Sequence, residues 1–172
     1  MKPPFTLTNT MLNDMVEISS LVGQLQVQHG RNLALRRESR IRSIQSSLAI
    51  ENNSLSLEQV TAILDGKRVL GPPDDIQEVK NAYDAYEKIL AYDPFSVNDF
   101  LKAHELLTQG LVGQSGRFRS KDVGIYNSQG EVIHVGARPQ FVSGLVTDLF
   151  KWAKTDETPL LIKSAVVHYE IE

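Results

Sequence analysis

Apolar residues at helical spacing are the feature that most constrains how this 172-residue chain can fold. The clearest stripe starts at Met11 and continues through Met15, Ile18, Val22 and Leu25, so that the side chains recur every three or four residues. Such spacing places them on one face of a helix. Similar stripes, caps and helix breakers predict helices over about residues 8–28, 31–50, 57–65, 76–90, 96–110, 139–154 and 160–171.

A glycine-rich stretch over residues 113–138 interrupts the helical pattern. Within it, the turn-forming residues 127–130 lie between the β-branched positions Ile125 and Val132, which predicts one β-hairpin. The expected fold is therefore a mainly α-helical bundle with a β-hairpin insertion. The last helix is apolar nearly all round, so a place at the centre of the bundle is predicted. No Gly, Asn or Pro follows it, and we expect an incomplete chain.

Composition excludes several classes of function. The net charge of -3 gives no basic footprint for nucleic acid or for an anionic membrane, and the chain has no cysteine. No apolar stretch approaches the ~20 residues that a membrane span needs, and no signal peptide is recognisable. A cytoplasmic protein without membrane contact is the expectation, with nucleic acid as a partner only if a downstream domain binds it.

Common catalytic motifs are missing. The helix bearing His104 has Thr108 where a zinc-protease helix needs its second histidine, and no metal site is predicted. The chain also lacks the phosphate-binding loop of P-loop proteins and the Gly-x-Ser-x-Gly turn of serine hydrolases. His104 and His168 are expected to be hydrogen-bonded core residues.

Residues 46–60 resemble the inhibitory segment of Fic-domain (Fido) proteins, whose signature is Ser/Thr-x-x-x-Glu-Gly/Asn. Ser47, Glu51 and Asn52 match its three fixed positions, and residues 55–60 match the Leu-Ser/Thr-Leu-x-x-Val pattern that follows. The resemblance implies a Fic protein of class II, with the inhibitory motif N-terminal to its core.

The rest of the chain resembles the same family in order. Residues 100–107 are similar to the helix before the target-binding hairpin, called the flap, and residues 116–125 to the start of the flap. Residues 139–152 are similar to the helix after the flap, and 159–172 to the helix that leads into the catalytic loop. We therefore expect residues 1–70 to form an N-terminal extension with the inhibitory helix, and residues 71–172 to form the N-terminal part of the Fic core, incomplete at its C-terminus.

The resemblance implies transfer of AMP from Mg-ATP to a Ser, Thr or Tyr hydroxyl of a protein substrate. The family's catalytic motif, His-Pro-Phe-x-Asp/Glu-Gly-Asn-Gly-Arg, is not among residues 1–172. The full-length parent is thus expected to be an ATP- and Mg-dependent protein adenylyltransferase. This chain alone is expected to be inactive, with no catalytic residue, no cofactor and a tendency to self-associate.

Two sites follow from the resemblance. Glu51 would pair with the last arginine of the catalytic motif and so deny it to the ATP γ-phosphate, while Ser47 and Asn52 hold the helix end. The flap, including Val123, Gly124, Ile125 and Tyr126, would pair through its backbone with an extended target segment.

Alternatives without a specific functional role stay open for each site, and other functions stay open for the whole protein. Residues 47–52 could be an ordinary helix end with a solvated carboxylate, and the hairpin could simply cover the core. For the whole protein, the alternative is a non-enzymatic helical interaction module with a Fic-like shape. A parent that transfers another phosphate-containing group is a third possibility.

Overall fold

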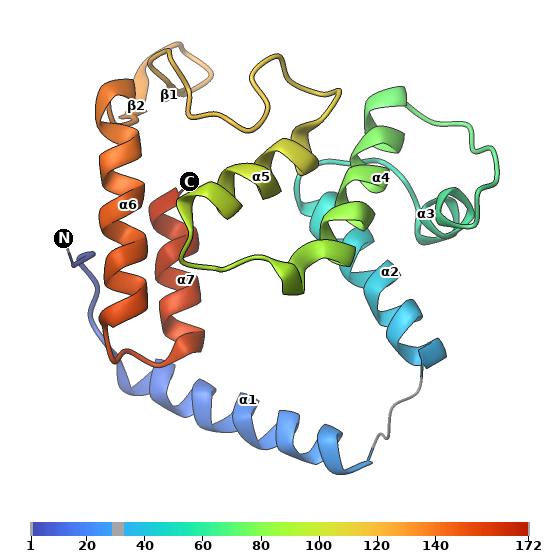
Figure 1. Ribbon diagram of the computed structural model, residues 1–172, viewed down its shortest axis with the longest axis horizontal. Helices are drawn as coiled ribbons and strands as arrows, with labels where there is room; N and C mark the ends of the chain where they lie inside the picture. Colours follow the sequence, from blue (N-terminus) through green and yellow to red (C-terminus); the bar gives the residue numbers. More distant parts are fainter. Residues whose placement is uncertain (1, 29–32, 172) are drawn as a thin grey trace. The chain divides into compact units, whose positions relative to one another are not determined.

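The computed structural model describes residues 2–28 and 33–171 (Figure 1). Within these ranges it contains seven α-helices, one short 3-10 helix and one two-stranded antiparallel sheet. The predicted fold class, a mainly helical fold with one hairpin, is confirmed. The elements are α1 (Asn9–Gln28), α2 (Leu33–Ile50), α3 (Leu57–Leu64), α4 (Pro73–Lys88), η1 (Ile89–Ala91), α5 (Val97–Thr108), β1 (Gly124–Tyr126), β2 (Val132–Val135), α6 (Pro139–Thr155) and α7 (Leu160–Ile171).

Local sequence signals explain several helix boundaries. At the start of α3 the Ser56 hydroxyl accepts the Gln59 amide, and the Gln59 side chain accepts the Ser56 amide, which completes a capping box. The helix ends before Gly66, whose φ of +75° suits glycine. Helices α4 and α6 each begin with a proline in the first turn, where no amide hydrogen is needed.

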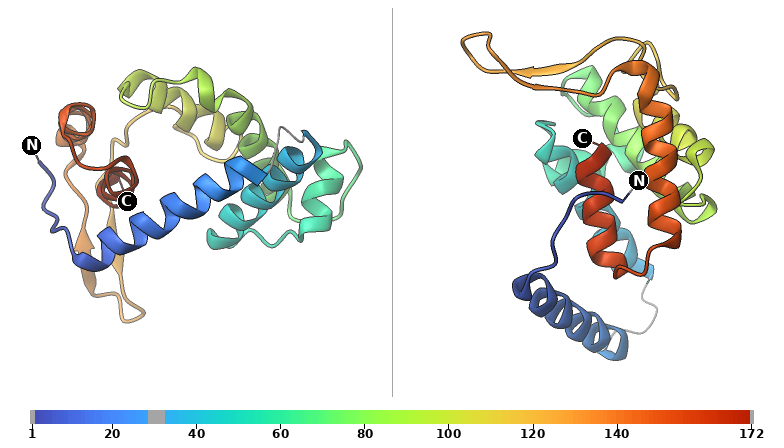
Figure 2. Two further views of the ribbon diagram at one scale, coloured as in Figure 1. Left: turned by 90° about the horizontal axis from the view of Figure 1, so that it is seen from below. Right: turned by 90° about the vertical axis from the view of Figure 1, so that its left-hand side faces the viewer.

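The chain divides into two compact units, and the first comprises the described residues of Met1–Gln28, Phe95–Val97 and Phe118–Glu172. Helices α6 and α7 pack side by side in it, and the hairpin precedes α6 (Figures 1 and 2). The N-terminal segment joins this packing, because the Phe5 ring meets Trp152 edge-on at 5.8 Å between centroids. Lys2 lies 3.9 Å from the Asp156 carboxylate.

The second unit comprises the described residues of His29–Pro94 and Asn98–Arg117. Its core lies where α2, α3 and α4 meet (Figure 1). Buried apolar side chains fill this core: Ile41, Ile44, Leu55, Val60, Ile63, Val79 and Ala82. Burying such side chains supplies the main driving force for folding of the unit.

A buried asparagine links α4 to the end of α5 within the second unit. Asn81 is 4% exposed, and its side-chain amide donates to the carbonyls of Leu107 and Gln109 at 3.0 and 2.8 Å. The last carbonyls of a helix lack intrahelical partners, so Asn81 satisfies groups that would otherwise be unpaired.

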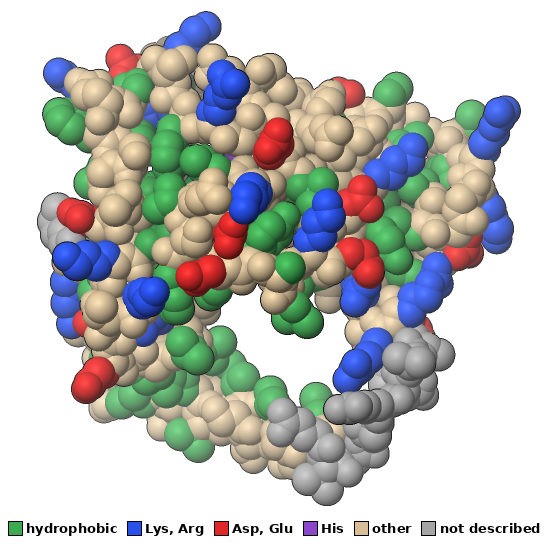
Figure 3. Space-filling view, in the orientation of Figure 1, with side chains coloured by type: hydrophobic (Ala, Val, Ile, Leu, Met, Phe, Trp, Pro, Cys, Tyr) green, Lys and Arg blue, Asp and Glu red, His purple; other side chains and the backbone are tan. Residues whose placement is uncertain are grey.

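The prediction of a buried final helix is wrong for the described residues. Only Ile162 and Lys163 of α7 are buried, and His168 is exposed. Helix α1 also exposes apolar side chains, visible as a green row along its length in Figure 3. No helix within residues 2–28 and 33–171 is long and apolar enough to cross a membrane.

Candidate functional site

The end of α2 carries the three predicted inhibitory residues, all within the second unit. Asn52 adopts φ of +69°, and its amide donates to the Ala49 carbonyl at 3.2 Å. The Asn53 amide reaches back to the Leu48 carbonyl at 3.0 Å. These two hydrogen bonds form a Schellman motif, in which the residue just past the helix is left-handed. Glycine and asparagine tolerate that conformation best, which explains why the signature ends in Gly or Asn.

Glu51 occupies the last position before this left-handed residue, and its side chain is exposed. In the described part of the chain, its carboxylate makes no ion pair or hydrogen bond. A negative charge at a helix C-terminus opposes the helix dipole and costs a few tenths of a kcal/mol or more. The Glu51 carboxylate therefore does not stabilise α2, and it is available to a cationic partner.

Ser47 precedes Glu51 by one helical turn, so the two side chains share a face of α2. Ser47 is exposed as well. The structure thus brings Ser47, Glu51 and Asn52 together at one helix end, although their inhibitory role stays a prediction.

The residues that follow Glu51 are tied to the first turn of α4. The Ser54 amide and hydroxyl both donate to Oδ2 of Asp75, at 2.8 and 2.5 Å. These two hydrogen bonds, the one from the hydroxyl first, lower the pKa of Asp75 from its usual 3.8. The Asn53 side chain donates to the Asp75 carbonyl and the Glu78 carboxylate at 3.1 and 2.8 Å. Asn53 and Ser54 therefore tie the turn after α2 to α4.

The hairpin contains all four predicted flap residues and belongs to the first unit. Gly124 pairs with Val135, Ile125 with His134 and Tyr126 with Val132, with a register shift after Ile125. The Asn127 side-chain oxygen accepts the amides of Gln129 and Glu131 at 3.0 and 2.9 Å and closes the turn. The predicted hairpin is thus confirmed, with an Asn-stabilised turn and a bulge.

The outer edge of β1 is formed by alternate residues. Because the Gly136 amide donates to the Val123 carbonyl at 2.9 Å, Val123 and Ile125 direct their backbone groups toward β2. Gly124 and Tyr126 then direct theirs away from β2, toward the open edge. A strand with an open edge can pair with another extended chain.

The base of the hairpin is closely packed. A Cβ at Gly136 would lie 2.8 Å from Cγ2 of Val123, so only glycine fits there without a shift. The Arg119 guanidinium donates to the Ala137 carbonyl and, at 3.0 Å, to the Lys121 carbonyl. Arg119 thereby joins the two ends of the hairpin.

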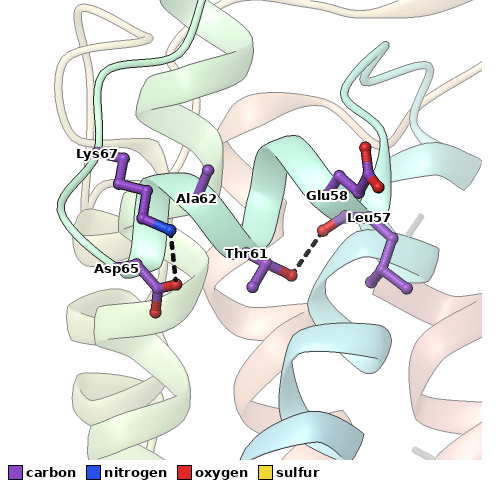
Figure 4. Close-up of a pocket in the computed structure, with 6 residues that line it drawn as sticks. All are labelled: Leu57, Glu58, Thr61, Ala62, Asp65 and Lys67. Atoms are coloured by element: carbon purple, nitrogen blue, oxygen red, sulfur yellow. Dashed lines mark hydrogen bonds and ion pairs between the residues drawn. The ribbon is translucent and has the colours of Figure 1, made fainter.

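A shallow groove of about 250 Å³ lies on α3, lined by Leu57, Glu58, Thr61, Ala62, Asp65 and Lys67 (Figure 4). It is smaller than the roughly 300–1,000 Å³ typical of ligand sites. Among the described residues, no group of three or more His, Cys, Asp or Glu side chains could hold a metal ion. We assign no metal ligand to the described residues.

The described residues form a helical fold with a projecting hairpin. At the capped end of α2, the Glu51 carboxylate has no partner in the described part of the chain. Residues 94–172 match the sequence profile of the Fic/DOC family. The chain is also similar to the crystal structure of a Fic family protein from Desulfovibrio desulfuricans G20, with a TM-score of 0.89 and 45% sequence identity. The chain is a Fic domain protein.

The match covers 99% of this chain and 53% of the Desulfovibrio chain, so the chain spans about half the length of that relative. No curated protein gives a significant match. The predicted division at residue 70 into an extension and a Fic core stays a prediction.

Sequence reasoning did not anticipate the contacts of Ser54 and Asn53 with α4. Their partners Asp75 and Glu78 lie more than twenty residues away, and no local pattern pairs them. The turn preference of Asn and Ser after a helix was the only available signal.

Proposed function

We propose that this chain supplies the inhibitory helix and the target-docking flap of a self-inhibited protein adenylyltransferase. The observation that carries the proposal is Glu51, an exposed and unpaired carboxylate in the described part of the chain, at a helix end closed by a Schellman motif. Fic family membership supports the transfer of a phosphate-containing group to a target. That this group is AMP, and that the protein inhibits itself, is our specific proposal.

Inhibition follows from competition for one arginine. An arginine binds a carboxylate or a phosphate through the same fork of N–H donors, so it cannot serve both fully. Glu51 would occupy the last arginine of the catalytic motif, and the γ-phosphate of ATP would lose that partner. The Schellman motif supports this role, because it fixes the backbone on both sides of Glu51.

Target docking follows from the open edge of β1. The outward backbone groups of Gly124 and Tyr126 would pair with an extended segment of a protein substrate and present its Ser, Thr or Tyr hydroxyl. Main-chain pairing depends weakly on side-chain identity, so the flap would accept several sequences. Val123 and Ile125 would support this pairing through their exposed apolar side chains.

ATP is the substrate of the proposed reaction and Mg²⁺ its cofactor. Neither is assigned to the residues described, which offer no cluster of metal ligands. In the proposal both bind at the family's catalytic motif, and this chain's own residues act by occupying an arginine and by orienting the target.

The reaction type is tested with a longer form that carries the catalytic motif, incubated with Mg-ATP labelled on either the α- or the γ-phosphate. AMP transfer requires protein labelling by the α-label only. Labelling by the γ-label alone would indicate phosphate transfer. No labelling by any longer form, together with binding of a partner, would favour the non-enzymatic interaction module.

A further inference from the structure

His104 makes a hydrogen bond at the point where the flap segment starts. Its Nδ1 atom lies 2.9 Å from the amide nitrogen of Gly116, within the second unit. A backbone amide can only donate, so Nδ1 must be unprotonated and must act as the acceptor. The single proton of the neutral ring is then on Nε2.

Gly116 has no easy alternative conformation or replacement. Its φ is +70°, and a Cβ there would lie 2.8 Å from Cβ of Glu105 on α5. The turn at Gly116 thus packs directly against Glu105 of α5, which is the residue that follows His104. Only glycine combines this conformation with this close approach.

Two hydroxyl contacts flank the same turn. Ser115 Oγ donates to the Glu105 carbonyl at 2.7 Å and lies 2.7 Å from Oγ1 of Thr108. Helix α5 therefore holds residues 115 and 116 through the Glu105 carbonyl and the side chains of Thr108 and His104. Among these contacts, the imidazole is the one that satisfies the Gly116 amide.

We propose that His104 is a positioning residue for the flap: by accepting the Gly116 amide in its Nε2-protonated form, it fixes the turn from which the flap segment leaves α5. The inference rests on the proposed function, since only there does the hairpin orient a target. Seven residues, 117–123, lie between Gly116 and Gly124. Because this connection is short, greater conformational freedom of the backbone at Gly116 should also increase the mobility of β1.

The test uses the 172-residue chain and three variants, followed by NMR. His104→Asn keeps an acceptor near the position of Nδ1, and His104→Leu removes it. Ser115→Ala is the matched control, because it removes the neighbouring hydroxyl contacts with α5 and leaves the imidazole in place. We expect the Gly116 amide of His104→Leu to exchange roughly tenfold faster, as the loss of one hydrogen bond predicts. His104→Asn should restore protection.

The spectra of the imidazole nitrogens and of the hairpin amides complete the test. We expect an unprotonated Nδ1 in the wild type and in Ser115→Ala, and lower order at Gly124 and Tyr126 in His104→Leu only. A protonated Nδ1, unchanged Gly116 exchange in His104→Leu, or equal loss in His104→Asn would overturn the inference. These spectra need neither nucleotide nor target, so failure of the proposed transfer activity is seen separately, as absence of labelling.

Discussion

Ser54 donates two hydrogen bonds to one carboxylate oxygen of Asp75, from its amide at 2.8 Å and from its hydroxyl at 2.5 Å. This contact joins the turn after α2 to the first turn of α4. Together with the left-handed Asn52, it fixes the backbone around Glu51 without using the Glu51 side chain. The backbone that carries Glu51 therefore loses little further entropy when the carboxylate binds an arginine, and only the side chain still has to be ordered.

Replacing Asn52 tests the helix end. Asn52→Ala should lower the free energy of unfolding by about 1 kcal/mol, because a Cβ-bearing residue other than Asn is strained at positive φ. Asn52→Gly, which accepts this conformation, is the control and should match or exceed the wild type. Urea unfolding followed by circular dichroism measures both. Equal losses in the two variants would contradict the left-handed cap.

Two isoleucines on α2 give a matched pair for the core. Ile44 is fully buried and Ile50 is 79% exposed. Ile44→Ala should destabilise the second unit by about 2–5 kcal/mol, since it leaves a cavity. Ile50→Ala should change stability by less than about 0.5 kcal/mol. Similar unfolding midpoints for the two variants would show that the core is assigned wrongly.

The Asp75 contact predicts a dependence on pH. Hydrogen bonds from Ser54 lower the pKa of Asp75 below 3.8, so the ionised carboxylate stabilises the folded state. This stabilisation is present above the unfolded-state pKa and is lost as the pH falls through the lower folded-state pKa. Ser54→Ala should thus be less stable than the wild type near pH 7, and the difference should shrink in acid. A difference independent of pH would argue against the contact.

Nucleotide binding tests where the catalytic machinery lies. Calorimetric titration of the 172-residue chain with Mg-ATP should show negligible heat, because the proposal places the nucleotide at the family's catalytic motif, which is not among residues 1–172. Micromolar affinity would mean that the nucleotide site lies within this chain. Heat-denatured protein serves as the control for non-specific binding.

Self-association is expected from the apolar side chains that α1 and α7 expose, among them Val16 at 70% and Leu160 at 75%. Exposed apolar surface of this kind is commonly covered by another chain. Sedimentation velocity should show an average mass that rises with concentration. A monodisperse monomer at high concentration would contradict this prediction.

The sequence predicted the elements that depend on local signals. The helical stripes and the Asn-containing turn before Gly130 have short-range causes, and both lie where they were predicted. Predictions that required tertiary contacts were weaker. The burial of α7 was inferred from its composition alone, and composition does not say which neighbours are present.

The residues of the candidate site also divide into those predictable from local sequence and those that depend on tertiary contacts. Glu51 and Asn52 were found from a linear pattern, because a helix end and its cap are consecutive in sequence. The bond between His104 and Gly116 spans twelve residues and a left-handed turn, and no pattern links the two. His104 was predicted to be a hydrogen-bonded core residue. Its hydrogen bond is confirmed, although the partner could be identified only from the structure. Its place in the core is wrong, because α5 has no buried residue and His104 is only half-buried.

Removing the Glu51 carboxylate tests the central claim most directly. Glu51→Gly, made in a longer form with the catalytic motif, should label itself or a target with AMP from Mg-ATP at least tenfold faster than the wild type. The reason is that the freed arginine can then bind the γ-phosphate. Glu58→Gln, an exposed carboxylate on α3, is the control and should label at the wild-type rate. Equal labelling by Glu51→Gly and the wild type would contradict the inhibitory role of Glu51.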